Sequence, residues 1–297
     1  MALASGNPGG LEVSGAMLTD AGCVRASNED AVAFVIPSHD DPKAGRGCLL
    51  IVADGMGGHA AGEVASGMAA EIIRQVYYSR LEPVPASLMI AFETANRAIL
   101  EHAQESPGCK GMGTTCTALV IQSGELFLAH VGDSRAYILR GGKLTQLSGD
   151  QTLHAQMIRE GLLTDEEAKL ASGGNVILQA LGTSPRIHPA VWENGIPLAA
   201  DDILVLCSDG LWNLVEDTII AELAGRAEPQ EACQRLISAA LEKGGYDNVS
   251  VGIFAMRPAD GAAASPQSAT RRIEVPAPEP APEAAATRSL ELPEGLA

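Results

Sequence analysis

The residues best suited to chemistry in this sequence are aspartates that stand where apolar runs begin or end, next to glycine, asparagine or serine. They are Asp30, Asp54, Asp133, Asp209 and Asp247. If the strands that carry them are neighbours, several carboxylates meet at one edge of the fold. Carboxylates packed that closely raise each other's pKa, and divalent cations relieve the repulsion. All-oxygen ligands favour Mg²⁺ or Mn²⁺ over zinc, which prefers histidine and cysteine.

The chemistry that such a site offers is the transfer of a phosphoryl group to water. Two cations about 4 Å apart can activate a bridging water as hydroxide and hold a phosphoryl oxygen for in-line attack. Arg25 precedes Asp30 in the same loop and can hold the other phosphate oxygens through its guanidinium fork. Each motif alone is also compatible with an ordinary turn, and Asp133 can equally be a hairpin residue paired with Arg135. The hypothesis depends on their occurring together.

The stretch LLIVADGMGGHAAG at residues 49–62 is the centre of this pattern. Its apolar run at 49–53 has the length of a buried strand and ends at Asp54. Glycines follow at positions 55, 57, 58 and 62, before a helical pattern that starts near Glu63. A carboxylate at a strand end, followed by a glycine-rich turn, suits a ligand that must come close to the backbone, such as an oxygen-binding cation.

The elements that must position these residues follow from hydrophobic periodicity. Strands are expected at 13–19, 31–36, 49–53, 114–121, 125–131, 135–139, 202–207 and 249–256, and helices at 63–81, 86–104, 216–224 and 230–243. The three strands after residue 113 are joined by turn residues, which indicates an antiparallel meander. Between 148 and 197 the pattern changes to short elements, with a helix expected at 153–162 and a capping box at 164–167.

These patterns predict one folded unit with flexible ends. Residues 1–12 are small and polar and are expected to be flexible, and 13–256 form the main domain. The segment 148–197 is interpreted as an insertion over an edge of the fold, where lids are often found. Residues 257–297 hold seven of the 17 prolines and many alanines, so disorder is expected there.

Composition excludes several classes of partner. The chain of 297 residues is 46% hydrophobic, which is enough for a sizeable core, and its net charge is −17. Nucleic acid and anionic membranes are therefore not expected as partners, because both require clustered Lys and Arg. No apolar run reaches the length of a membrane span, and the N-terminus lacks the pattern of a signal peptide. The six cysteines are scattered, as in a reducing compartment, so a cytoplasmic protein is expected.

The order of the motifs adds a family resemblance. The sequence contains R-x-x-N-E-D, A-D-G-M-G-G-H-x-A-G-E-x-A-S, G-x-G-T-T, H-V-G-D-S-R-A-Y, C-S-D-G-L-W and G-x-x-D-N-V-S-V, from about residue 19 to 254. In this order and spacing they resemble the metal-dependent type 2C Ser/Thr protein phosphatases (PPM), in their bacterial form. The resemblance implies an α+β fold, a β-sandwich of two antiparallel sheets flanked by helix pairs, with 148–197 as the flap beside the active site.

The resemblance also implies a function. The protein would be a hydrolase that removes phosphate from phosphoserine and phosphothreonine of proteins, opposing bacterial Ser/Thr kinases, and it would act as a monomer. Its cofactors would be two Mn²⁺ or Mg²⁺ ions, with a third, weaker metal. Asp54 would bridge the two metals, and the Gly55 carbonyl would bind one of them. Asp209 and Asp247 would complete the ligands of one metal.

Four further residues receive roles from the resemblance. Glu29 and Asp30 would act near the other metal, partly through water. Arg25 would bind the substrate phosphate, and Asp133 would help to hold the third metal.

The chain departs from animal members of the family at two positions. A histidine that is a candidate general acid in animal members is replaced here by Met56, and His59 lies further along the same turn. Asn213 stands where animal members carry an aspartate that binds the third metal, which implies a weaker or differently built third site. The identity of the acid that protonates the leaving group therefore stays open.

Other classes of protein fit less well. A cysteine-based phosphatase needs an arginine at a fixed spacing after its cysteine, and no cysteine here has one. The glycines at 55–58 break the dinucleotide-binding spacing. The alternative kept open is a non-catalytic interaction protein on the same fold that senses phosphate or metal.

Overall fold

The computed structural model describes residues 4–6, 10–57, 61–170 and 176–259. Its strands form two antiparallel sheets. The first sheet has the order β1-β2-β13-β12-β8-β9, with bounds Ala4–Gly6, Leu11–Asp20, Val249–Pro258, Ile203–Cys207, Arg135–Arg140 and Lys143–Gln146. The second has the order β10-β7-β6-β4-β3, with bounds Ala190–Val191, Glu125–Val131, Cys116–Gln122, Cys48–Met56 and Asp30–Val35. Two short strands join its margins, β5 (Gly113–Thr114) beside β4 and β11 (Ile196–Pro197) beside β7.

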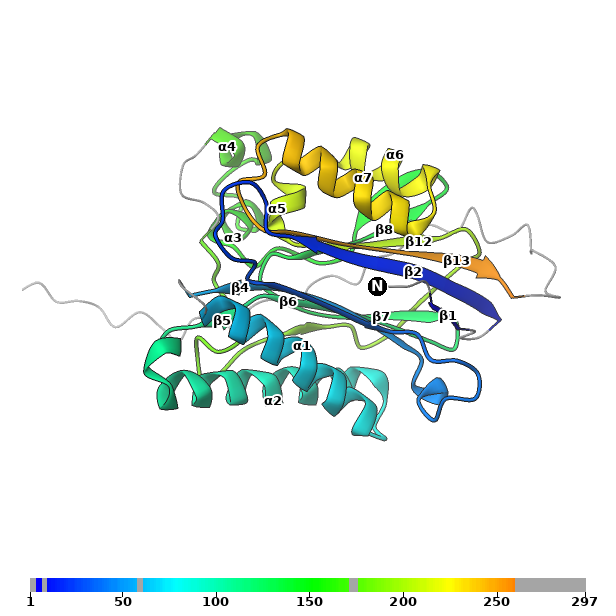
Figure 1. Ribbon diagram of the computed structural model, residues 1–297, viewed down its shortest axis with the longest axis horizontal. Helices are drawn as coiled ribbons and strands as arrows, with labels where there is room; N and C mark the ends of the chain where they lie inside the picture. The colour runs from blue at the N-terminus through cyan, green and yellow to red at the C-terminus, as the bar shows by residue number, and fades with distance from the viewer. Residues whose placement is uncertain (1–3, 7–9, 58–60, 171–175, 260–297) are drawn as a thin grey trace, which may run out of the picture.

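Four layers result, because both faces of each sheet are covered (Figure 1). Helices α1 (Ala61–Ser79) and α2 (Val84–Glu105) lie on the outer face of the second sheet. Helices α6 (Asp217–Arg226) and α7 (Pro229–Glu242) lie on the outer face of the first, with the short helix α5 (Asp209–Trp212) at the end of β12. The predicted α+β sandwich flanked by helix pairs is confirmed.

The central strand shows why its sequence is apolar without interruption. Side chains alternate between the two faces of a strand. Leu50 and Val52 of β4 pack in the core between the sheets, whereas Leu49 and Ile51 pack against the helices. Because β4 is covered on both sides, its whole run is buried.

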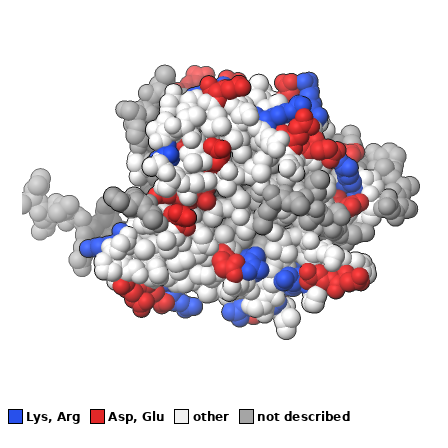
Figure 2. All heavy atoms as spheres, in the orientation of Figure 1, with Lys and Arg blue, Asp and Glu red and all other residues white. Residues whose placement is uncertain are grey.

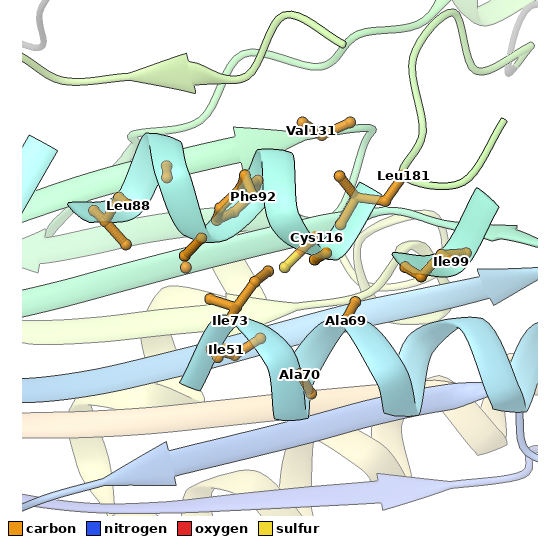
Figure 3. Packing of buried hydrophobic residues seen from close by; sticks show 14 of the residues in the cluster. Ile51, Ala69, Ala70, Ile73, Leu88, Phe92, Ile99, Cys116, Val131 and Leu181 are labelled. Atoms are coloured by element: carbon orange, nitrogen blue, oxygen red, sulfur yellow. The ribbon is translucent and has the colours of Figure 1, made fainter. Parts of the chain in front are cut away.

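The core under α1 and α2 fixes the position of these helices. Figure 3 shows Ile73 of α1 and Phe92 of α2 pointing toward one another next to Ile51 and Cys116 of the sheet. Because α1 packs on the sheet that contains β4, the start of this helix is held beside the end of that strand.

Several elements differ from the expectations. Strand β1 pairs with β2, and β2 begins at Leu11, although flexibility was expected over 1–12. Strand β9 and helix α5 were not predicted. The segment 148–197 contains helices α3 (Leu153–Arg159) and α4 (Asp165–Leu170), and it returns to the second sheet as β10 and β11. The expected capping box is present, with the Thr164 N–H donating to the Glu167 carboxylate at 2.9 Å.

Most of the tail predicted at 257–297 lies outside the described residues, with β13 continuing to Pro258. None of the helices in the described part of the chain is long and apolar enough to cross a membrane.

Candidate metal and phosphate site

Antiparallel pairing brings the predicted carboxylates to one end of the sandwich. Asp30, at the start of β3, is directly opposite Asp54 near the end of β4. In the other sheet, Cys207 at the end of β12 pairs with Arg135 at the start of β8 and with Val251 of β13. The turns that hold Asp133, Asp209 and Asp247 adjoin these pairs.

A pocket of about 500 Å³ opens at this end of the molecule. Its lining residues are Arg25, Ala26, Ser27, Glu29, Asp54, Gly55, Met56, Gly57, Asp133, Ile177, Asp209, Asp247 and Asn248. Seven of the eight predicted site residues are thus brought together. Asp30 lies behind the pocket and is not among the lining residues that the structure describes.

Asp54 has the most strongly perturbed environment of the group. Burial raises its pKa well above the ordinary value, and the charges of Asp30 and Asp209 raise it further. Its backbone is fixed, since its N–H donates to the Thr115 hydroxyl at 3.0 Å and its carbonyl accepts from the Thr114 hydroxyl at 2.9 Å. The carboxylate is therefore held where ionisation is costly unless a cation is bound.

Asp30 is anchored by two hydroxyl groups. Ser208 and Ser250 each donate a hydrogen bond of 2.7 Å to its Oδ2 atom. Burial raises the pKa of Asp30 to about 7, although these two hydrogen bonds act in the opposite direction. Asp30 thus acts on Asp54 through its charge and ties β3 to the ends of β12 and β13.

Asp133 is buried and does not pair with Arg135. Burial raises the pKa of Asp133 to about 7. Arg135 instead binds Asp150 at 2.6 Å and lies over the Trp212 ring, with 3.6 Å between the guanidinium carbon and the ring centre. The indole N–H of Trp212 donates to the Asp133 carbonyl at 3.0 Å. The alternative interpretation, in which Asp133 pairs with Arg135 in the hairpin, is therefore wrong.

Asp209 carries an atom without a partner. Its Oδ2 atom accepts from the Asn213 amide at 3.1 Å, whereas its Oδ1 atom is buried and has no hydrogen-bond partner among the described residues. A buried carboxylate oxygen left in this state costs free energy, on the order of 1–3 kcal/mol. Asn213, which departs from the animal members, is thus in direct contact with a predicted metal ligand.

Arg25 lies at the mouth of the pocket. Its guanidinium group is 2.6 Å from Asp247, and its side chain is 54% exposed, so a phosphate in the pocket can reach it. The loop that carries Arg25 is held by Asn248, which the sequence analysis did not select. Asn248 accepts from the Glu29 N–H at 2.8 Å and donates to the carbonyls of Ala21 and Ser27 at 2.9 Å each.

The glycines of the central motif are required by close backbone approach. A Cβ atom at Gly55 would lie 2.2 Å from the carbonyl oxygen of Gly62 and 2.5 Å from that of Glu29. A Cβ atom at Gly62 would lie 2.5 Å from the Glu29 carboxylate. The start of α1 therefore presses against the end of β4, which exposes the Gly55 backbone to the pocket. His59 lies outside the described residues.

The donor set fits hard divalent cations. Every acidic side chain in the pocket offers oxygen, and burial raises the pKa of Asp54, Asp133 and Asp209. The buried Oδ1 atom of Asp209, which accepts no hydrogen bond from the described residues, fits contact with a cation. Within the described ranges, no group of three or more histidine, cysteine or acidic side chains is arranged so that it could hold a metal ion by itself. The fit therefore rests on charge and hydrogen bonding, and further ligands must come from backbone carbonyls and water.

Comparison with known proteins gives the same family as the motifs. A sequence model described as Protein phosphatase 2C matches residues 24–243. The serine/threonine protein phosphatase PstP of Mycobacterium tuberculosis is 41% identical over 236 residues, which cover 78% of this chain and 43% of that protein. The serine/threonine phosphatase stp of Listeria monocytogenes is 33% identical over 239 residues, covering 78% of this chain and 92% of that one. The chain thus spans less than half the length of its mycobacterial relative.

Solved structures agree in fold. The crystal structure of the Mycobacterium tuberculosis phosphatase PstP/Ppp matches with a TM-score of 0.73 at 37% identity, covering 82% of this chain and 99% of that chain. The catalytic domain of PstP in complex with two manganese ions matches with a TM-score of 0.71, also at 37% identity, covering 83% and 99% of the two chains.

Proposed function

The chain belongs to the protein phosphatase 2C family, and from this premise we propose that it removes phosphate from phosphoserine and phosphothreonine side chains of proteins with the help of divalent cations. The observation that carries the proposal is the pocket itself, where one exposed arginine adjoins five buried or half-buried carboxylates that lie near separate strand ends. Such a site can bind cations and a phosphate together. The two manganese ions of the PstP catalytic domain support the cofactor assignment.

We assign the metal ligands residue by residue. Asp54 would bridge two Mn²⁺ or Mg²⁺ ions, with the Gly55 carbonyl on one of them. Asp209 and Asp247 would complete the ligands of one ion. Glu29 would act near the other ion, with Asp30 behind it. When bound, these ions supply Lewis acidity and a lowered pKa of water. Asp133 with Asp209 would give a third, weaker site, which Asn213 modifies.

The chain's own residues then perform three tasks. Arg25 binds the phosphate oxygens through its guanidinium group, whose parallel N–H donors can contact two oxygens at once. Asn248 orients the Arg25 loop through its three hydrogen bonds. Met56 lines the pocket and has no proton to give, so the proton for the departing serine or threonine oxygen comes from another source.

We propose the finer assignments on separate grounds. Since phosphoserine and phosphothreonine are products of protein kinases, a Ser/Thr kinase would supply the substrates. This chain supplies both the carboxylates and the arginine of the pocket, and we propose that it acts as a monomer. We propose residues 13–256 as the catalytic domain and 148–197 as its flap, because Ile177 of this segment lines the pocket. The six unpaired thiols support a reducing, cytoplasmic location.

A peptide assay tests the proposed function. Phosphothreonine, phosphoserine and phosphotyrosine peptides of one sequence would be incubated with the full chain and Mn²⁺, Mg²⁺ or a chelator, and released phosphate measured. We expect turnover of the first two peptides with either metal and none with the chelator. Turnover that persists in chelator, or that is confined to phosphotyrosine, would contradict the proposal.

A further inference from the structure

Two loops beside the pocket are tied together in a way that leaves two apolar side chains exposed between the ties. The Cys23 N–H donates to the Gly245 carbonyl at 2.8 Å, and Arg25 binds Asp247 at 2.6 Å. Val24 and Tyr246 are the residues between these contacts, and each is 65% exposed. Single exposed apolar residues are common on proteins, so their place beside the pocket has to carry the argument.

That place is continuous with the phosphate-binding group. Val24 precedes Arg25 and Tyr246 precedes Asp247, and both of these charged residues line the pocket. A phosphorylated side chain that reaches Arg25 therefore brings the neighbouring residues of its peptide over Val24 and Tyr246. The occupant of this surface is thus an extended segment of substrate next to the phosphorylated residue.

A second apolar margin borders the same pocket from the segment 148–197. Ile177 lines the pocket, and its neighbours Val176 and Leu178 are exposed. The backbone at Ile177 forms an isolated antiparallel bridge with Thr152, in which the Leu153 N–H donates to the Val176 carbonyl at 2.9 Å and the Leu178 N–H donates to the Gln151 carbonyl at 2.8 Å. The margin is therefore in place before substrate binds.

The charges between the margins limit which peptides fit. Apart from Arg25, every charged residue of the pocket lining is acidic. An acidic residue next to the phosphate would be repelled, whereas an apolar one gains contact area on either margin.

We propose that Val24 and Tyr246 are specificity-determining residues that bind an apolar side chain flanking the phosphoserine or phosphothreonine of the substrate. The proposal rests on the proposed phosphatase function and adds a sequence preference to it. Tyr246 offers the larger contact area, because its ring is larger than the Val24 side chain and is equally exposed, at 65%.

The test compares peptides that differ only beside the phosphothreonine. Peptides with leucine, aspartate or lysine at the flanking positions would be assayed with Mn²⁺ for the wild type, Tyr246→Ser, Val24→Ser and Tyr246→Phe. The readout is the ratio of kcat/KM for the leucine peptide to that for the aspartate peptide, because a ratio cancels any general change in activity. We expect Tyr246→Ser to lower this ratio by about 5- to 10-fold, Val24→Ser by about half as much, and Tyr246→Phe to restore it.

Leu81→Ser is the matched control. Leu81 is more exposed than either residue, at 96%, and follows the end of α1 that is remote from the pocket, so its removal should leave the ratio unchanged. A ratio that is the same in wild type and Tyr246→Ser would overturn the proposal, as would a preference for the lysine peptide, since the acidic rim would then set specificity. Hydrolysis of a small aryl phosphate ester distinguishes a failure of this specificity proposal from a failure of the phosphatase function. If neither the ester nor any of the peptides is hydrolysed, the proposed phosphatase function itself is wrong.

Discussion

At the scale of residues, several buried side-chain atoms have no hydrogen-bond partner among the described residues. The Oδ1 atom of Asp209 is one, and the Nε2 atom of His130 is another. The first belongs to the pocket and the second lies in β7, inside the sheet. Their consequences therefore differ, because the first concerns binding and the second concerns stability.

His130 predicts acid sensitivity. Its ring is completely buried and is hydrogen-bonded to Thr117 at 2.8 Å, and burial lowers its pKa to about 4. A histidine whose pKa is lowered in the folded state favours unfolding once pH falls below the ordinary value, and the full loss is reached below its folded pKa. We expect His130 to cost the protein about 2 kcal/mol at pH 5 relative to pH 7. Urea unfolding at both pH values, for wild type and His130→Gln, measures this difference. An equal pH dependence in the two proteins would contradict the assignment.

Asn248 predicts a loss of activity that is separate from stability. Removing its side chain in Asn248→Ala frees the Arg25 loop, so we expect kcat/KM to fall about 10- to 100-fold, a typical cost when a group that positions a functional residue is lost. Asn96→Ala is the control, because Asn96 also bridges chain segments, with hydrogen bonds to the Gly182 N–H and the Ser184 carbonyl, but does not line the pocket. Similar activity losses in both variants would show that Asn248 acts only through stability.

At the scale of elements, the fold places the ends of separate strands against one another and uses glycine where they touch. Asp54 and Asp30 come from adjacent strands, and Asp209 comes from the other sheet. The sandwich therefore holds carboxylates that repel one another at one of its ends, and bound cations reduce this repulsion.

This repulsion predicts that metal binding reverses the effect of removing the Asp54 charge on the stability of the protein. Burial raises the pKa of Asp54, and a carboxyl of this kind stabilises the fold at low pH and loses that contribution as pH rises. In chelator at pH 8, Asp54→Asn should therefore have a free energy of unfolding higher than that of wild type by on the order of 1–3 kcal/mol, and should unfold at a higher temperature. With Mn²⁺ the order should reverse, since only the wild type gains the binding energy. Thermal unfolding of the two proteins in each buffer measures this order of stability. A variant that is less stable than wild type in both buffers would contradict the prediction.

The glycines of α1 give a paired test of the contact between helix and strand. A Cβ atom at Gly62 would lie 2.9 Å from the Gly55 backbone, whereas at Gly67 it would meet nothing within 4 Å. We expect Gly62→Ala to destabilise the protein by about 1–3 kcal/mol through overpacking. Gly67→Ala should stabilise it by about 0.5–1 kcal/mol, because alanine favours the helix. If urea unfolding showed the same change in stability for both variants, the contact between Gly62 and the Gly55 backbone would not be tight.

At the scale of the whole molecule, much of the fold and of the site follows from the sequence, because both depend on local patterns. The apolar run of β4 and the Asp-Gly turn after it are visible without a structure, and so are the helices with one apolar stripe. The motifs also select the site residues, of which Asp30 proves to lie behind the pocket.

The features that the sequence does not reveal depend on which loops lie next to one another in the fold. Asn248, Ser208 and Ser250 have ordinary polar side chains whose importance arises only when β2, β3, β12 and β13 end at the same place. Strand β9 is short and half-buried, with too few residues for a period to be visible. No signal in the sequence alone separates Val24 and Tyr246 from other surface residues, because their exposure depends on the ties between their loops.

The net charge of −17 gives the molecule a surface that suits neither nucleic acid nor anionic lipid. On the face seen in Figure 2, the described Lys and Arg side chains are scattered among Asp and Glu and do not gather into one area. An acidic protein binds a phosphorylated substrate best where cations cancel its own charge, which makes metal binding the central claim.

Phosphate release from a phosphothreonine peptide, measured with Mn²⁺ for the wild type and for Asp209→Asn, tests this claim most directly. We expect metal-dependent turnover in the wild type and a loss of about 100-fold or more in the variant, with a folded variant in circular dichroism. A folded wild type that binds Mn²⁺ but releases no phosphate from any phosphopeptide would contradict it, and would instead fit a protein that only senses phosphate or metal.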